Sequence, residues 1–187
     1  MKITKSLIKE LILEEMNALK YAEDKHKGQT RKFGGTPYVE HPKNVARLAK
    51  KNGFPVHIVK AAYLHDTLED TDATYEDIHE LFGEVVANLV LELTNNEDDI
   101  KTMGKTLYMI NKLSKLSTDA LSIKLLDRLD NVSDFETAGE KFVIKYSKAT
   151  IDIIAGIREK NIKLTNKQED IIEQILEIAQ PFYNKYY

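Results

Sequence analysis

Apolar residues recur every three to four positions along most of the chain, and this spacing predicts amphipathic helices. The first predicted helix covers residues 5–27, in which Leu11, Ala18 and Ala22 line one face. Sustained alternation of apolar and polar residues, which would indicate strands, does not occur in the sequence. We therefore expect an all-α fold.

Glycine and proline mark the boundaries of the next predicted elements. Residues 28–40 contain several such residues and are predicted to form a loop. His41 and Pro42 open a second helix, because proline is tolerated in the first helical turn, where its missing N–H has no partner. Pro55 opens a third helix that is apolar nearly all round, so we expect it to be buried. Further helices are predicted over residues 75–82, 84–93, 100–116, 119–135, 139–159 and 167–183, with breaks at 71–74 and 94–99.

The chain has 187 residues, the length of one ordinary domain. Only 8 of these residues are glycine and 4 are proline, which favours long helices. No low-complexity linker, charge block or internal repeat divides the sequence. We therefore expect a single domain over residues 1–187.

Charge and cysteine content exclude several classes of partner and site. The formal net charge is −3, so no overall positive field favours nucleic acid or acidic membranes, and an anionic ligand needs a local site. The absence of cysteine excludes disulfides, thiolate metal ligands and cysteine nucleophiles. Residues 1–9 lack the pattern of a signal peptide, and no apolar run reaches 18 residues. We expect a cytoplasmic protein that binds neither nucleic acid nor membrane.

Four ionisable residues follow the apolar third helix: His65, Asp66, Glu69 and Asp70. If that helix continues through them, a rotation of about 100° per residue places all four on one arc. Three carboxylates beside a buried helix are costly unless a cation neutralises them. Imidazole with carboxylate, and no sulfur, suits manganese, iron or zinc better than calcium. The alternative is a helix end that simply reaches solvent.

Two other positions extend this candidate metal site. His41 opens the preceding helix, and a tight turn between the two helices can bring it back towards His65. Asp127 and Asn131 are four residues apart on a helix with a strongly apolar face, so they lie on the same side of it. An aspartate at position 127 can supply a fourth ligand.

Positive charge gathers around the start of the predicted loop before His41, at Lys25, Lys27, Arg31 and Lys32. Guanidinium and ammonium groups beside a metal suit a phosphate substrate, because arginine binds phosphate with two hydrogen bonds and lysine provides a point charge. The alternative is a solvated basic turn.

The basic residues before His41, His41 itself, the run from His65 to Asp70 and the helix with Asp127 follow one another in an order that resembles the HD-domain metal phosphohydrolases. Within them the closest resemblance is to the (p)ppGpp hydrolase domain of the RelA/SpoT alarmone enzymes, and above all to the stand-alone small alarmone hydrolases. The similarity covers about residues 18–135, and the residues after it read as closing helices to 187. The stretches that carry it are His26 to Lys32, Gly35 to Ala46, Ala61 to Thr71, Phe82 to Ala87 and Lys124 to Asn131.

The resemblance implies a single compact bundle of helices and one bound manganese ion. His41, His65, Asp66 and Asp127 match the four protein ligands of that ion. The longer relatives also carry a synthetase domain, which has no counterpart in this sequence, so alarmone synthesis is not expected.

The resemblance also implies catalytic and substrate-binding residues. Glu69 and Asp70 match the acidic pair that orients or deprotonates the attacking water. The reaction implied is hydrolysis of (p)ppGpp at its 3′-diphosphate, which releases pyrophosphate and GDP or GTP. The positions that match residues near the nucleotide are Arg31, Lys32, Asn131 and Tyr146.

The sequence departs from the family pattern next to Asn131. Asp130 replaces a common His or Tyr, and Ser133 stands where an Arg is usual. These changes leave open whether the base of the substrate is guanine or adenine. A deoxynucleotide and NADPH also stay open as substrates. A catalytically silent nucleotide-binding module is the alternative from another class. The oligomeric state and the physiological metal also stay open.

Overall fold

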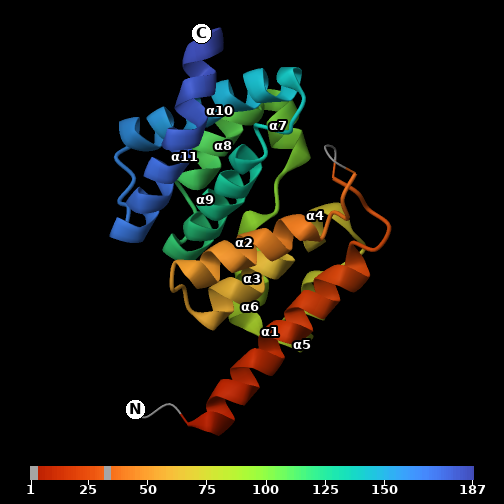
Figure 1. Cartoon of the computed structure of the whole chain (residues 1–187). Coiled ribbons are helices and arrows are strands. Elements are labelled where there is room, and N and C mark those ends of the chain that lie inside the picture. The colour runs from red at the N-terminus through yellow and green to blue at the C-terminus, as the bar shows by residue number, and fades with distance from the viewer. Residues whose placement is uncertain (1–3, 32–34) are drawn as a thin grey trace. The chain divides into compact units, whose positions relative to one another are not determined.

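The computed structural model describes residues 4–31 and 35–187, and the side chains of all these except residues 7 and 8. These residues form eleven helices, and their only β-type pairing is an isolated bridge between Thr30 and Pro37 (Figure 1). The predicted all-α fold is confirmed. The helices are α1 (Lys5–Lys25), α2 (Glu40–Lys51), α3 (Val56–Leu64), α4 (Thr67–Asp70), α5 (Tyr75–Phe82), α6 (Glu84–Leu93), α7 (Glu97–Met103), α8 (Lys105–Leu113), α9 (Thr118–Ser133), α10 (Glu140–Glu159) and α11 (Asn166–Tyr186).

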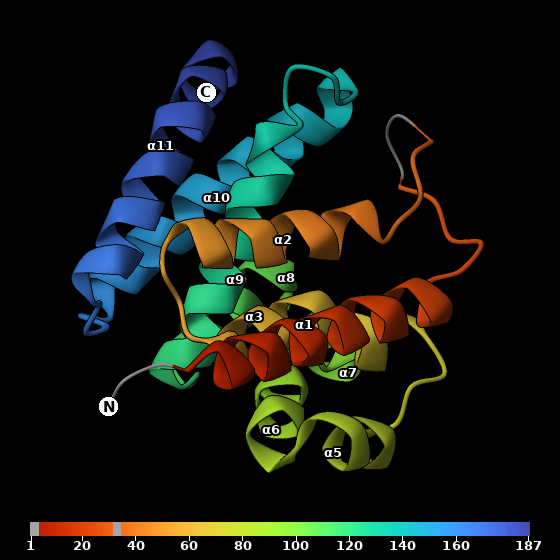
Figure 2. The same cartoon turned by 60° about the horizontal axis from the view of Figure 1, so that its bottom comes forward.

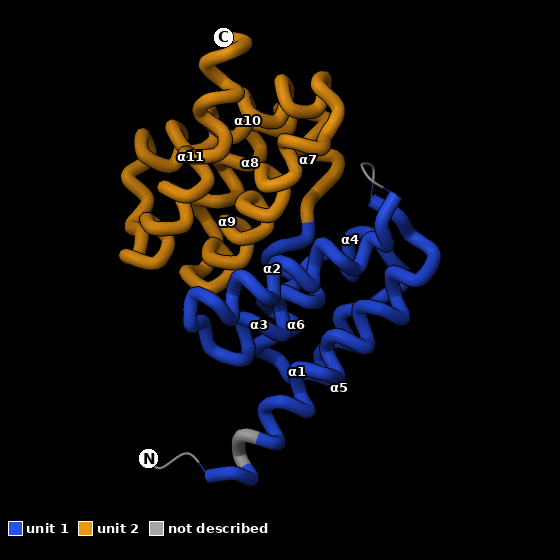
Figure 3. Tube along the Cα trace, in the orientation of Figure 1, with its two compact units in different colours: residues 1–31, 35–94 blue, residues 32–34, 95–187 orange. Residues whose placement is uncertain are grey.

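The helices fall into two compact units (Figure 3). Unit 1 comprises residues 1–31 and 35–94 and holds α1 to α6, whereas unit 2 comprises residues 32–34 and 95–187 and holds α7 to α11. None of the helices among the described residues is long and apolar enough to cross a membrane.

Helix α3 forms the centre of unit 1, where it packs against α1, α2 and α6 (Figure 2). Ile58, Val59 and Leu64 are each at most 1% exposed, and a rotation of about 100° per residue points them to different sides of the helix. Burying one large aliphatic side chain contributes about 1.5–3 kcal/mol, so an apolar helix of this kind is stable only when covered all round. The predicted buried helix is thus confirmed.

Helix α9 provides much of the core of unit 2 and packs against α10 and α11. Ile123, Leu125 and Leu126 are almost completely buried. Gln168 of α11 is also fully buried, and its amide donates hydrogen bonds to the Thr118 carbonyl at 2.9 Å and to Ser122 Oγ at 3.0 Å. This satisfied polar contact fixes α11 on the start of α9.

The predicted helix over residues 100–116 is instead two helices, α7 and α8. Gly104 separates them with φ of +82°, a conformation that residues with a Cβ rarely adopt. The stretch predicted as a loop over 94–99 contains the start of α7, where the Asn96 side chain accepts hydrogen bonds from the N–H groups of Asp98 and Asp99. An asparagine N-cap with an acidic first turn is a local start signal.

Helices α8 and α10 approach closely at Gly156 in unit 2. A Cβ at this position would lie 2.7 Å from Ile110 Cδ1 and 2.8 Å from two further carbons of the same side chain. We expect Gly156→Ala to lower the free energy of unfolding by about 1–2 kcal/mol in urea denaturation, because overpacking outweighs the better helix propensity of alanine. The exposed neighbour Ala155 offers the control, and Ala155→Ser should change stability by less than about 0.5 kcal/mol. Stabilisation by Gly156→Ala would contradict this close packing.

Candidate metal centre and active site

The chain turns sharply after α3, and this turn positions the candidate ligands of unit 1. Helix α3 ends at Leu64 and the short α4 begins at Thr67, so the prediction of one helix through residues 65–70 is wrong. Thr67 Oγ1 donates to the Leu64 carbonyl at 2.7 Å, and His65 Nδ1 donates to the Ala62 carbonyl at 2.9 Å. These side chains satisfy carbonyls of the last turn of α3 and end the helix there. His65 is consequently buried, while Glu69 is exposed.

His65 has the chemistry of a metal ligand. Its Nδ1 is assigned a proton because it faces a carbonyl, so in the neutral ring Nε2 carries the lone pair. Nε2 is buried and has no hydrogen-bond partner in the part of the chain that the structure describes. It lies 3.1 Å from Asp66 Oδ2, without the geometry of a hydrogen bond. A lone pair and a carboxylate at this distance repel each other unless a positive charge is shared between them.

His41 completes the cluster of unit 1. It lies in the first turn of α2, is 4% exposed, and its ring centre is 5.1 Å from that of His65. His41 Nε2 is 3.7 Å from the same oxygen, Asp66 Oδ2. Two imidazoles and one carboxylate are a donor set suited to a divalent transition metal. Unit 1 therefore gathers three of the four predicted ligands.

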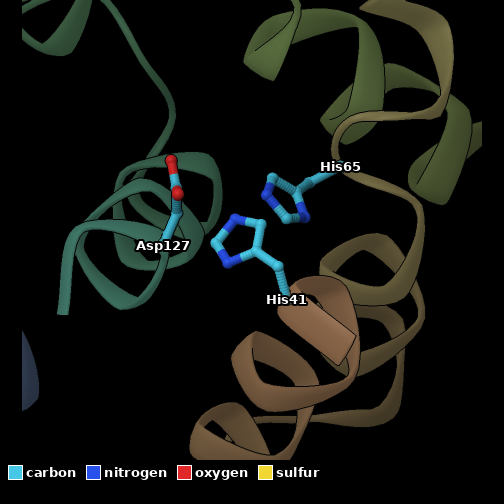
Figure 4. A group of neighbouring side chains, drawn as sticks. All are labelled: His41, His65 and Asp127. Atoms are coloured by element: carbon cyan, nitrogen blue, oxygen red, sulfur yellow. The ribbon is translucent and has the colours of Figure 1, made fainter. Parts of the chain in front are cut away.

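Asp127, the fourth predicted ligand, belongs to α9 of unit 2. Figure 4 labels its side chain together with those of His41 and His65. Within unit 2, Asp127 Oδ2 is 3.2 Å from Lys124 Nζ, and Asn131 Nδ2 donates to Oδ1 at 2.7 Å. Asn131, predicted to face the nucleotide, thus orients this carboxylate.

Asp70 ends α4, close to Asp66. Burial raises the pKa of the Asp70 carboxyl, and the negative charges of Asp66 and Glu69 raise it further. A hydrogen bond from the Tyr38 hydroxyl, at 3.2 Å, opposes this shift. Asp70 therefore holds a proton more readily than an ordinary aspartate.

The basic loop is only partly described. Arg31 is half-buried, and its backbone N–H donates to the Thr36 carbonyl at 2.9 Å, which closes the loop beside the Thr30 bridge. Lys32 lies outside the described residues. Lys25 forms an ion pair with Asp72 at 2.8 Å, which gives this cation a structural partner.

Tyr146, the predicted substrate-lining tyrosine, lies in an aromatic cluster of unit 2. Its ring stacks on Phe142 with centres 5.0 Å apart and meets the edge of Phe135 at 6.1 Å, and the Arg128 guanidinium lies 5.0 Å from its centre. Burial raises the pKa of the Tyr146 hydroxyl, so it stays protonated at neutral pH. Its role towards a substrate stays a prediction.

Sequence reasoning assigned no role to Tyr38, whose hydroxyl donates to Asp66 Oδ2 at 2.6 Å. The available signal was its position three residues before His41, in the turn that leads into α2. His26 and Gln29, which precede it in the same matched motif, are linked to each other by a hydrogen bond of 2.7 Å.

Several known proteins are similar to this chain. The HD domain family model matches residues 18–161. A Xenopus tropicalis protein named guanosine-3′,5′-bis(diphosphate) 3′-pyrophosphohydrolase MESH1 is 36% identical over 165 residues, covering 84% of this chain and 90% of that protein. An Aquifex aeolicus guanosine-3′,5′-bis(diphosphate) 3′-pyrophosphohydrolase is 39% identical over 150 residues, covering 79% of this chain but 21% of that longer protein.

A solved structure described as a metazoan orthologue of SpoT that hydrolyses ppGpp superposes with a TM-score of 0.73 and 29% sequence identity. The match covers 88% of this chain and 94% of that one. The family model spans well over half of the chain, and the Xenopus relative is matched over nearly its full length. The chain therefore belongs to the HD domain family and is a relative of the small RelA/SpoT-type (p)ppGpp pyrophosphohydrolases.

Proposed function

We propose that this protein is a manganese-dependent hydrolase that removes the 3′-diphosphate of (p)ppGpp as pyrophosphate and leaves GDP or GTP. The observation that carries the proposal is the buried cluster of His41, His65 and Asp66, in which a lone pair faces a carboxylate oxygen at 3.1 Å. The names of the MESH1 relatives and of the metazoan SpoT orthologue supply the substrate.

The proposed ligands of the ion are His41, His65 and Asp66 of unit 1 and Asp127 of unit 2. Nitrogen and carboxylate oxygen without sulfur favour manganese, iron or zinc, and the resemblance selects manganese among them. When bound, the ion supplies Lewis-acid activation of water and of a phosphate oxygen. The Ala62 carbonyl holds the His65 ring in the tautomer that ligation requires.

The remaining residues act on the water and on the phosphates. Glu69 is exposed on α4 and orients the attacking water, whose proton it accepts with the help of Asp70. The water oxygen bonds to the phosphorus next to the ribose, the bond from phosphorus to the 3′-oxygen breaks, and that oxygen leaves with a proton. Arg31 and Lys32 offset phosphate charge. Asn131 and Tyr146 contact the nucleotide.

This proposal treats units 1 and 2 as one working HD domain over residues 1–187. The family model supports it, because its match over residues 18–161 includes helices of both units. Cytoplasmic location belongs to the same proposal, since a chain without cysteine suits a reducing compartment.

A substrate panel tests the proposed function. The purified chain should release pyrophosphate from ppGpp and pppGpp in the presence of Mn²⁺, and much less from ppApp, a deoxynucleoside triphosphate or NADPH, the last assayed as phosphate release. Chelation with EDTA should stop the reaction, and Mn²⁺ should restore it better than Mg²⁺. No turnover of ppGpp alongside rapid turnover of another compound would reject the substrate, and activity in EDTA would reject the metal dependence.

A further inference from the structure

The hydroxyl of Tyr38 lies between two acidic residues of the proposed active site. It donates to Asp66 Oδ2 at 2.6 Å and lies 3.2 Å from Asp70 Oδ2. A phenol has one hydrogen to donate, so Asp66 at the shorter distance is its main acceptor and Asp70 is a weaker one. The oxygen that accepts it is the one that faces His65 Nε2 at 3.1 Å and His41 Nε2 at 3.7 Å. The hydroxyl thus fixes the orientation of a proposed ligand.

The backbone of Tyr38 is itself held on both sides. Its N–H donates to the Gln29 carbonyl at 2.9 Å, and its carbonyl accepts from the His41 N–H at 3.0 Å. These bonds hold Tyr38 in the turn that leads into α2 and connect it to His41 through the main chain. The phenol is therefore positioned by the same turn that positions a candidate metal ligand.

His26 and Gln29 extend the same network to the end of α4. The His26 ring is 2% exposed and lies 4.9 Å from the Tyr38 ring, centre to centre. Its Nδ1 donates to Gln29 Oε1 at 2.7 Å, and Gln29 Nε2 donates to the Asp70 carbonyl at 2.7 Å. The loop that carries Tyr38 is thereby fastened to the residue that ends α4, and little freedom is left to the phenol.

We propose that Tyr38 is a positioning residue of the reaction, an inference that rests on the proposed function. Its hydroxyl orients Asp66 Oδ2 towards His41 and His65, so that the three residues can hold the metal ion. It also fixes the position of the Asp70 carboxylate relative to Asp66. Tyr38 acts through these two carboxylates. A role limited to packing would instead need only its ring, which lies against His26 and His41.

Tyr38→Phe separates the two roles, because it keeps the ring and removes the hydroxyl. We expect the dissociation constant for Mn²⁺ to rise about tenfold or more, and kcat for ppGpp to fall about 10–100-fold, as is usual when a hydrogen bond to a metal ligand is lost. KM for ppGpp, measured at saturating Mn²⁺, should change less than about threefold, and the melting temperature of the metal-free chain should stay within a few degrees. Mn²⁺ binding is measured without substrate, by the electron paramagnetic resonance signal of free Mn²⁺.

Tyr75→Phe is the matched control in the same unit. The Tyr75 hydroxyl donates to Asn88 Oδ1 at 2.8 Å, and its ring stacks on His79, so the change removes a comparable hydrogen bond that involves no carboxylate. We expect wild-type Mn²⁺ affinity and kcat. Wild-type Mn²⁺ affinity in Tyr38→Phe, or an effect on KM alone, would overturn the proposal. If wild type binds Mn²⁺ but does not hydrolyse ppGpp, the proposed function fails, while weaker Mn²⁺ binding by Tyr38→Phe still supports the role of the hydroxyl.

Discussion

Replacing Asp66 by alanine is expected to abolish metal binding and activity together. Asp66 Oδ2 lies 3.1 Å from His65 Nε2, and the Asp66 side chain is only 13% exposed. Without this carboxylate, two neutral imidazoles are left in unit 1 to hold a divalent ion, which binds them more weakly. A bound ion contributes several kcal/mol to the stabilisation of the transition state, so we expect kcat/KM to fall by about 1,000-fold or more.

Metal content after gel filtration and pyrophosphate release from ppGpp measure the effect of Asp66→Ala. The control is Asp72→Ala, because Asp72 is a nearby aspartate whose side chain is 88% exposed and paired with Lys25. Asp72→Ala should keep both metal and activity. The ligand assignment is wrong if Asp66→Ala retains full metal content and full activity.

Replacing Glu69 by alanine is expected to leave metal largely bound and to slow the reaction. Glu69 is exposed on α4, next to the buried cluster but outside it, so its loss removes a group that handles water and leaves the ligands in place. Positioned acid–base groups typically accelerate a reaction 10²–10⁴-fold, and we expect kcat to fall by about this factor. Metal content should stay near that of wild type.

Two further variants sharpen this result. Glu69→Gln keeps the size and polarity of the side chain but cannot accept a proton, so it should be nearly as slow as Glu69→Ala. Glu76→Ala, at an exposed glutamate of α5 in the same unit, should behave as wild type. Full activity of Glu69→Ala with metal bound would exclude the catalytic role. Inactivity of the wild-type chain on every nucleotide tested, with metal bound, would instead favour a silent binding module.

Helices with strong local signals were predictable from the sequence. Residues 75–82 and 84–93 were predicted as they occur in α5 and α6. Thr74 and Asp77 form a reciprocal capping box at the start of α5, and Gly83 separates the two helices with φ of +85°. These signals need no knowledge of tertiary contacts, which explains why both boundaries were found.

The end of α3 could not be predicted from periodicity. The apolar pattern continues through Leu68, but hydrogen bonds from His65 and Thr67 to carbonyls of α3 end the helix at Leu64. Such side-chain bonds compete with the helix, and the spacing of apolar residues does not reveal them. The metal-binding residue types were identifiable, but the turn that directs His65 inward was not.

The contact of Tyr38 with Asp66 was hidden for a different reason. Asp66 lies 28 positions further along the chain, and the sequence does not indicate which carboxylate a phenol will meet. By contrast, the start of α7 at Asn96 and its end at Gly104 are local signals that apolar spacing alone overlooks. The sequence therefore hid both a long-range contact, that of Tyr38 with Asp66, and local hydrogen bonds that apolar spacing does not reveal.

Asp127 would have to exchange existing polar partners for the metal ion if it acts as a ligand. Its two carboxylate oxygens already interact with Lys124 Nζ and with the Asn131 amide. Lys124 is itself 9% exposed, so a cation is kept beside this carboxylate within unit 2. We expect a divalent ion at Asp127 to displace part of this existing attraction, whereas at Asp66 it would relieve the repulsion between that carboxylate and the lone pair of a neutral His65 ring. We therefore expect the proposed ligands of unit 1 to contribute more to the affinity than Asp127 does.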